Sequence, residues 1–239
     1  MSGDSIMNFK HVPMDLGYDD LSCETKKSGR KYVDPDGNAY PSVTTVLGHL
    51  GEEAIQAWRA RVGPEEANRI SRQASTRGTA VHSLLEDYVN NDDSFKTKEF
   101  DNSAKELQHK QNIETASTVF DILNESLTEV WGQEVALYSK HLNMAGRADC
   151  VGMWNGKPAI IDYKTSRKTK KKEWISSYFM QTAAYAIMFE ERTGQPITQL
   201  VIVIAGDEGT QVFVEHRDNW TSQLWDAIKE YRRRKLFGR

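Results

Sequence analysis

Cysteine is scarce in this chain of 239 residues: it occurs twice, as Cys23 and Cys150, and never with CxxC spacing. A disulfide framework needs several cysteines, and a structural zinc site or a four-cysteine iron–sulfur cluster needs closely spaced ones. We therefore expect none of these three frameworks. Any bound metal ion would have to be held by carboxylate and histidine side chains.

Long apolar runs are also missing. No stretch approaches the roughly 20 residues that a transmembrane helix requires, and the first residues, MSGDSIMNFKH, lack the apolar core of a signal peptide. The net charge of −3 is small, so a surface that is basic throughout and binds nucleic acids everywhere is not expected. We expect an intracellular protein that has no membrane partner.

The order of hydrophobic patterns predicts an α/β fold with a helical N-terminal part. Residues 1–29 are expected to be a polar lead-in, and residues 30–239 a single domain. The N-terminal part is expected to contain a hairpin over 30–41, a short helix capped by Ser42, and three helices over 52–91 that begin near Glu52, at Pro64 and at Gly78. A helix over 103–131 and strands over 134–139, 144–153 and 158–163 should follow. The remaining elements are a helix over 174–193, strands over 200–205 and 211–215, and a helix over 220–236.

Two carboxylates and a lysine lie on the second and third of these strands. An Asn155-Gly156 turn joins the strands, so Asp149 and Asp162 should approach a common point. Lys164 should share a face with Asp162, because side chains alternate along a strand. Two carboxylates bind Mg²⁺ or Mn²⁺, and a nearby lysine can orient water or neutralise a phosphate. The alternative is a hairpin with solvated charges at its ends.

A basic segment over residues 164–172 follows directly after this strand, and a second covers residues 232–235. Such a segment alone is most simply a solvated loop or helix end. Next to a hydrolytic metal site, the first segment is instead interpreted as a rim that binds phosphate groups.

Several motifs occur in the order typical of one nuclease family. They are Gly146-x-x-Asp149, Asp162-x-Lys164 preceded by two isoleucines, Gln181-x-x-x-Tyr185, and the upstream Arg77-Gly-Thr-Ala-Val-His82-x-x-x-Glu86. Together they resemble the RecB-like branch of the PD-(D/E)XK nuclease superfamily. The run Pro41-Ser42-Val43-Thr44-x-Val46-Leu47 is similar to the mitochondrial genome maintenance exonuclease family and to related bacteriophage exonucleases. The resemblance covers roughly residues 30–215 and implies a mixed central sheet flanked by helices.

The resemblance also implies a set of metal ligands. Asp149 and Asp162 would be the core ligands, with the backbone carbonyl of Tyr163 and an imidazole nitrogen of His82 as further ones. A histidine on a helix is otherwise a packing residue. Glu134 resembles the acidic residue that often completes such a site, and it can equally be a strand-end charge. Nitrogen ligation makes Mn²⁺ an alternative to Mg²⁺.

Other residues are expected to contact the substrate. Gln181 and Tyr185 lie one helical turn apart and should share a face, where they can hold a phosphate or orient Lys164. The alternative is that Tyr185 packs in the core. The candidate DNA-binding residues are Ser42, Thr44, Arg77, Arg147, Thr165, Ser166, Arg167 and Lys168. For Ser42, helix capping alone is a sufficient role.

By resemblance, the helices over 52–91 would form an arch or wall above the active site, through which a single strand passes. Trp58 in this region could stack on a base, but a core position is favoured. The leading hypothesis is a metal-dependent DNA exonuclease for single-stranded DNA or single-stranded ends, in replication, recombination or repair. The alternatives are a structure-specific endonuclease of the same superfamily and a DNA-binding subunit without catalysis. A bacteriophage source, and hence the cytoplasm of a bacterial host, is expected.

Overall fold

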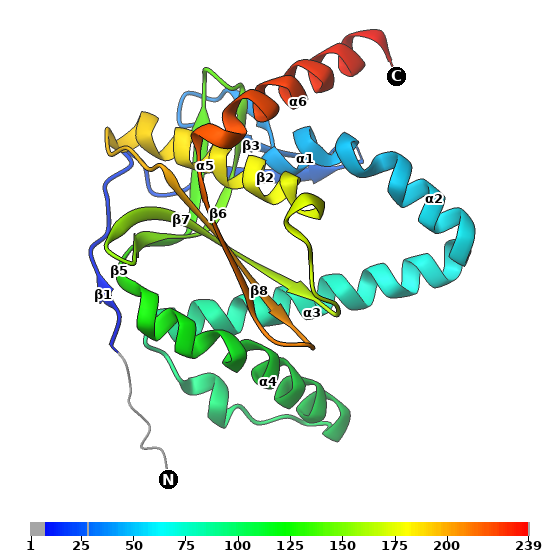
Figure 1. The fold of residues 1–239 in the computed structure, drawn as a ribbon, viewed down its shortest axis with the longest axis vertical. Coiled ribbons are helices and arrows are strands. Elements are labelled where there is room, and N and C mark those ends of the chain that lie inside the picture. Colours follow the sequence, from blue (N-terminus) through cyan, green and yellow to red (C-terminus); the bar gives the residue numbers. More distant parts are fainter. Residues whose placement is uncertain (1–7, 28, 239) are drawn as a thin grey trace.

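A six-stranded mixed sheet forms the centre of the computed structural model, which describes residues 8–27 and 29–238 (Figure 1). The strands lie in the order β1-β5-β6-β7-β8-β9. They are β1 (Lys10–His11), β5 (Leu127–Ser139), β6 (Met144–Trp154), β7 (Lys157–Ser166), β8 (Gln199–Gly206) and β9 (Gln211–His216). β1 runs parallel to β5 and β7 parallel to β8, and the other neighbours are antiparallel. The predicted α/β class with a mixed sheet is confirmed.

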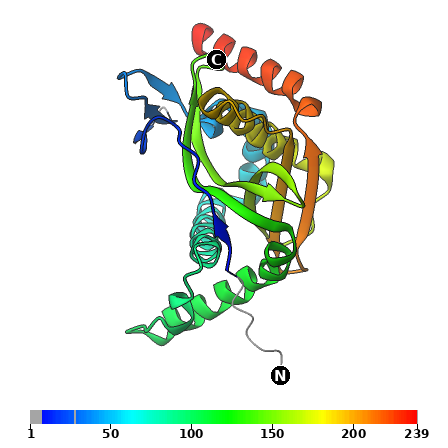
Figure 2. The same ribbon diagram turned by 90° about the vertical axis from the view of Figure 1, so that its left-hand side faces the viewer.

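Helices cover both faces of the sheet, because the central strands bury side chains on both sides. Along β8, residues 200, 202 and 204 pack with α1, α5 and α6, whereas residues 201, 203 and 205 pack with α3 and α4. α5 and α6 therefore lie on one side of the sheet and α3 and α4 on the other (Figures 1 and 2). The helices are α1 (Val43–Leu47), α2 (Glu52–Val62), α3 (Pro64–Val89), α4 (Ser103–Ser126), α5 (Ser176–Thr193) and α6 (Asp218–Phe237). Three 3₁₀ turns, η1 (Gly48–Gly51), η2 (Ser94–Thr97) and η3 (Lys172–Trp174), lie between them.

The hairpin of β6 and β7 opens a gap in the sheet. Its turn is the predicted one, with Asn155 at φ +49° and Gly156 at φ +75°. Pairing between the two strands ends at Cys150 and Ile161. Beyond that point β6 stays paired with β5, and β7 with β8. The residues at the point of separation, Asp149 and Asp162, consequently lie where neighbouring strands leave space for side chains.

The polar lead-in is part of the domain wherever the structure describes it. Phe9 is buried against α3 and α4, and β1 pairs with β5. β2 (Ser22–Lys26) pairs with β3 (Gly29–Val33), which pairs with β4 (Ala39–Pro41) in a second sheet. The predicted boundary at residue 29 was thus wrong, since it divides this small sheet. Residues 1–7 lie outside the described part of the chain.

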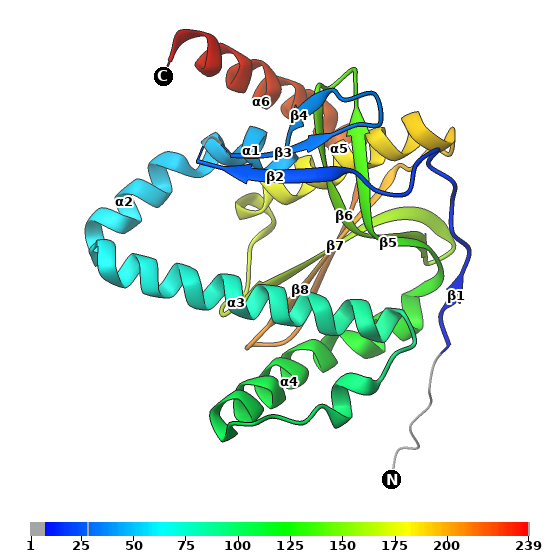
Figure 3. The same ribbon diagram turned by 180° about the vertical axis from the view of Figure 1, so that it is seen from behind.

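The helical region 52–91 contains two helices rather than three. α3 continues through Gly78, where the helix lies against β7, and a Cβ atom added there would lie 3.7 Å from Thr165 Oγ1. Figure 3 shows α2 and α3 meeting at a bend that projects from the rest of the chain. α2 buries no side chain, so the expectation that Trp58 is a core residue was wrong.

The helix predicted over 103–131 ends earlier, at Ser126. Leu127 already pairs with Trp154, and the alternating residues that follow extend β5 instead. Tertiary pairing here overrides a pattern that is compatible with either structure. Within the described residues, no helix has the length and apolarity to cross a membrane.

Candidate active site

A cleft of about 640 Å³ opens where β6 and β7 separate. Side chains from both faces and from the sheet itself line it. The lining residues are Arg30, Tyr32, Ser42, Thr44, Gly78, Thr79, His82, Ser83, Glu86, Glu134, Gly146, Arg147, Asp149, Lys164, Gln181 and Tyr185. Most residues that the sequence singled out are therefore brought to one place, although they span more than 140 positions of the chain.

Three potential metal ligands lie together in this cleft. His82, Glu134 and Asp149 each offer one ligand atom within 4.8 Å of the others, and they form one such cluster among the described residues. His82 Nδ1 lies 3.6 Å from Asp149 Oδ2. The same Asp149 oxygen accepts a hydrogen bond from the backbone N–H of Tyr163 at 2.7 Å, which replaces a bond of the interrupted strand pairing. α3 and two strands thus hold the cluster from different directions.

The backbone of Glu134 is strained. Its φ of +49° lies in the left-handed region, which a non-glycine residue adopts at a cost of about 1–2 kcal/mol. The Arg147 guanidinium holds this conformation by donating to the Glu134 carbonyl at 2.6 Å. Burial, together with Asp149 and Glu86, raises the pKa of Glu134 to about 7. A strained residue with a perturbed pKa in a cleft is typical of a functional position.

Asp162 and Lys164 form an ion pair at the base of the cleft. The Asp162 side chain is 2% exposed. Apart from this ion pair, neither of its carboxylate oxygens has a hydrogen-bond partner in the described chain. Burial, with help from Asp149, raises the pKa of Asp162 despite the lysine. Asp162 is not among the residues that line the cleft, although its ion-pair partner Lys164 and the neighbouring Asp149 both are.

Lys164 remains a cation. Burial lowers its pKa, but Asp162 and Asp149 outweigh burial and leave the pKa above its usual value. The ammonium also lies 5.1 Å from the centre of the Tyr178 ring. An ammonium that stays protonated suits the stabilisation of negative charge better than proton abstraction.

His82, in contrast to Lys164, favours its uncharged form. Burial lowers its pKa, although Asp149 favours the charged form. A neutral imidazole is the form that binds metal ions. One turn further along α3, Glu86 also lines the cleft, and burial together with Asp87 raises its pKa. Sequence reasoning noted Glu86 in the histidine motif but gave it no role, although the i, i+4 spacing to His82 places both on one face.

Gln181 and Tyr185 share the predicted helix face. Gln181 Nε2 donates to the Tyr185 hydroxyl at 3.1 Å. Tyr185 is 3% exposed, so its ring belongs to the core while it also forms a wall of the cleft. A Cβ atom at Gly146 would lie 2.6 Å from Tyr185 Cε1, which explains why this position of the G-x-x-D motif has no side chain. Tyr178, which the sequence analysis missed, lies on the same face three residues before Gln181.

The candidate DNA-binding residues are divided between different places. Ser42 caps α1 by accepting from the Thr45 N–H at 3.0 Å, and with Thr44 it lines the cleft. Arg147 also lines the cleft, and its guanidinium is paired with Asp20 at 2.7 Å. Five candidates are absent from the lining of the cleft: Arg77, Thr165, Ser166, Arg167 and Lys168. Arg77 and Arg167 line a neighbouring cavity instead, and the Ser166 hydroxyl donates to the Lys168 carbonyl at 2.6 Å.

Comparison with known proteins agrees with this geometry. The family model described as the PD-(D/E)XK nuclease superfamily matches residues 56–237. The chain belongs to this superfamily. The mitochondrial genome maintenance exonuclease 1 proteins of Homo sapiens and Xenopus tropicalis are 25% and 27% identical to it over 216 and 243 residues. These matches cover 83% and 94% of this chain but only 60% and 66% of the relatives, which are longer.

One solved structure, entitled "Crystal structure of SSO0001", shares 20% identity with the chain at a TM-score of 0.32. The match covers 53% of this chain and 66% of the other. A TM-score of this size does not establish a shared fold.

The residues of this PD-(D/E)XK cleft fit a divalent cation. Members of the superfamily use such ions, and here the donors are an imidazole with its pKa lowered and carboxylates that repel one another. The buried Asp162 oxygens that lack hydrogen bonds are further donors of the required type. The three clustered residues and Asp162 are therefore the ligand candidates.

Glu134 should make the stability of the metal-free protein depend on pH. Its pKa rises from an ordinary 4.5 to about 7 on folding, so its contribution is fully present below pH 4.5 and is lost as the pH rises through about 7. Thermal unfolding in a chelator should therefore show a smaller fall in stability across this pH window for Glu134→Gln than for the wild-type protein. Glu53→Gln, on the exposed surface of α2, should keep the wild-type slope. Identical slopes in all three proteins would contradict the assigned environment of Glu134.

Proposed function

We propose that this chain is a divalent-metal-dependent DNA exonuclease that acts on single-stranded DNA or on single-stranded ends. The observation that carries the proposal is the convergence of His82, Glu134 and Asp149 beside the Asp162–Lys164 pair, in a member of a nuclease superfamily. The relatives that match most of the chain are named exonucleases. These names support cleavage that starts from an end of the strand, which the geometry of the cleft alone does not address.

Asp149, Asp162, His82 and Glu134 would hold Mg²⁺ or Mn²⁺, as could the Tyr163 carbonyl. Such an ion, when bound, polarises a phosphoryl oxygen and lowers the pKa of water. The remaining chemistry belongs to the side chains. Lys164 places a fixed positive charge where negative charge develops on the scissile phosphate.

The carboxylate and amide groups around the lysine have complementary tasks. Glu134 lies beside His82 and Asp149 and would share the cation with them. Gln181 and the Tyr185 hydroxyl form a polar wall on the α5 side, where they can donate to a phosphate oxygen. These groups would orient the substrate before the P–O bond breaks.

The preference for a single strand rests on an aromatic side chain that follows the basic segment 164–172. Trp174 is 63% exposed, and the Lys171 ammonium lies 5.3 Å from its ring centre. In the sequence, Trp174 follows β7, which carries Lys164, and precedes α5, which carries Gln181. Unpaired bases stack on exposed aromatic rings, and lysines contact the phosphates between them. A duplex does not offer these base faces except at its ends.

Replacing Lys164 tests catalysis directly. We expect Lys164→Met to reduce cleavage of an end-labelled single strand in Mg²⁺ or Mn²⁺ by about 10²- to 10³-fold, because the fixed charge at the phosphate is lost. The control Lys157→Met removes an exposed lysine from the other end of the same strand and should retain activity. Undiminished cleavage by Lys164→Met would contradict the assignment.

The same assay separates the alternatives. An exonuclease should degrade the linear strand and leave a covalently closed circular strand intact. Cutting of the circle would favour a structure-specific endonuclease. Binding of DNA without turnover by the wild-type chain would favour a subunit that has the fold but no catalysis.

Trp174 provides a test of strand preference. Trp174→Ala should weaken binding of a single-stranded oligonucleotide by roughly 5- to 150-fold, the equivalent of about 1–3 kcal/mol for one stacked base. Trp174→Phe should restore most of the affinity, since phenylalanine keeps a ring. Binding can be measured by fluorescence anisotropy in a chelator. Equal affinities of the alanine and wild-type proteins would show that the tryptophan does not bind the strand.

A further inference from the structure

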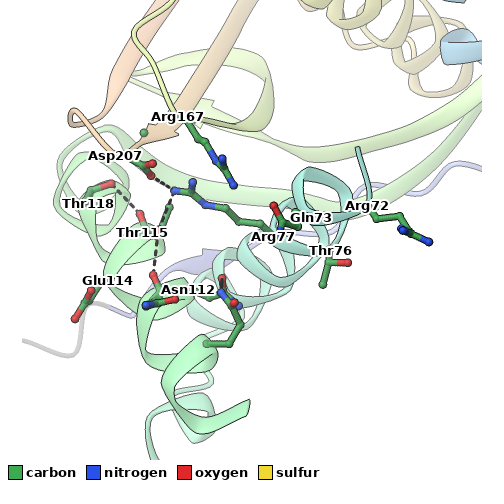
Figure 4. Close-up of a pocket in the computed structure, with 13 residues that line it drawn as sticks. Arg72, Gln73, Thr76, Arg77, Asn112, Glu114, Thr115, Thr118, Arg167 and Asp207 are labelled. Carbon is green, nitrogen blue, oxygen red and sulfur yellow. Dashed lines mark hydrogen bonds and ion pairs between the residues drawn. The ribbon is translucent and has the colours of Figure 1, made fainter. Parts of the chain in front are cut away.

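A second cavity, of about 830 Å³, lies on the neighbouring face of α3 (Figure 4). Its walls are the N-terminal half of α3, the middle of α4, the segment after β7 and the turn after β8. The lining residues are Arg72, Gln73, Thr76, Arg77, Gln108, Gln111, Asn112, Glu114, Thr115, Thr118, Arg167, Gly206 and Asp207. None of the catalytic candidates is among them.

Arg77 is fixed across this cavity. Its guanidinium forms an ion pair with Asp207 and donates to Thr115 Oγ1 at 3.2 Å, in both cases through Nη2. The turn that carries Asp207 is itself held to α4 by the Thr210 hydroxyl, which lies 2.7 Å from Thr118 Oγ1. No other N–H of the Arg77 side chain has a partner among the described residues. A held guanidinium with free donors is organised in advance for an anion.

The charges around Arg77 leave the cavity basic. Asp207 is offset by its ion pair, and Glu114 points away from the Arg77 guanidinium in Figure 4. Arg72 and Arg167 add two guanidinium groups that have no ion pair in the described chain. An anion would therefore meet more positive than negative charge here.

Apart from Glu114, the α4 wall is a stripe of uncharged polar side chains. Gln108, Gln111, Asn112, Thr115 and Thr118 repeat at helical spacing and all face the cavity. A stripe that faced the core would be apolar, and an ordinary solvated face would carry lysine and glutamate. Amides and hydroxyls can contact phosphate, sugar and base edges without regard to sequence.

The cavity and the catalytic cleft are lined by neighbouring residues of the same two stretches of chain. Arg167 follows Lys164 by three residues, and Arg77 precedes His82 by five on the same helix. Along α3, Thr76 and Arg77 line the cavity and Gly78 and Thr79 line the cleft, so the ridge between the two lies at this step of the helix.

We propose that this cavity binds the sugar–phosphate backbone of the same DNA strand, several nucleotides away from the scissile bond. The proposal rests on the proposed function and extends it, since it makes affinity depend on strand length. A strand that occupies only the catalytic cleft does not reach Arg77, whereas a longer strand crosses the ridge and binds both places.

Anisotropy in a chelator tests this, with single strands of about 6 and about 20 nucleotides. Wild type should bind the longer strand more tightly. Gln111→Glu, which puts a carboxylate into the α4 stripe, should weaken binding of the longer strand by about three- to tenfold and affect the short one much less. For the longer strand, the logarithm of the binding constant falls linearly with the logarithm of the salt concentration. Arg72→Gln should make this slope shallower by about 0.7, because one phosphate contact is lost. The control Gln223→Glu, on the exposed surface of α6, should bind both strands as wild type does.

The proposal is overturned if Gln111→Glu binds the longer strand as Gln223→Glu does, or if it weakens both lengths equally. A wild type without length preference overturns it as well. A free mononucleotide is also tested as a competitor of the longer strand. If, at equimolar concentration, it removes the part of the affinity that depends on Gln111, the cavity is a nucleotide pocket and not a backbone groove, and the proposal is overturned. Cleavage by wild type decides the proposed function separately, because these binding measurements involve no turnover.

Discussion

The mutual repulsion of buried carboxylates is the constraint on which the site depends. Asp149, Asp162 and Glu134 approach one another from three strands, and Lys164 offsets only part of their charge. Burial first, and the neighbouring carboxylates after it, raise the pKa values of Glu134 and Asp162. Such an arrangement is costly unless a cation completes it. The neighbouring imidazole, which burial keeps neutral, provides a donor and adds no positive charge.

The fold produces this repulsion by separating two strands. β6 and β7 leave each other after Cys150 and Ile161, so their next side chains enter a gap instead of packing against a partner strand. Alternation along β7 directs Lys164 towards α5, which explains its contact with Tyr178 and its place in the lining of the cleft beside Gln181. α3 reaches the same gap from the opposite face and supplies His82. The covered sheet is therefore a rigid frame, and the charges lie where the frame is open.

The sequence predicted the parts that depend on local patterns. The Asn155-Gly156 turn, the strand alternation that links Asp162 to Lys164, and the Gln181–Tyr185 face all follow from short-range rules. Other features depend on tertiary contacts that no local pattern contains. Strand pairing draws residues 127–131 out of a helix, and α3 runs unbroken through Gly78, where it lies against β7. The strained Glu134 and the separation of Arg77 from the cleft arise in the same way, since both depend on which elements become neighbours.

Thermal unfolding with and without a divalent cation tests the central claim most directly, because a ligand that binds only the folded state stabilises it. Mn²⁺ at about 100 times its dissociation constant should add about 2.7 kcal/mol to the free energy of unfolding of the wild-type protein. Asp149→Asn, which keeps the size of the side chain and removes a shared ligand, should lose most of this increment. An unchanged wild-type melting temperature, or an equal rise in the asparagine variant, would contradict a cation site built on these carboxylates.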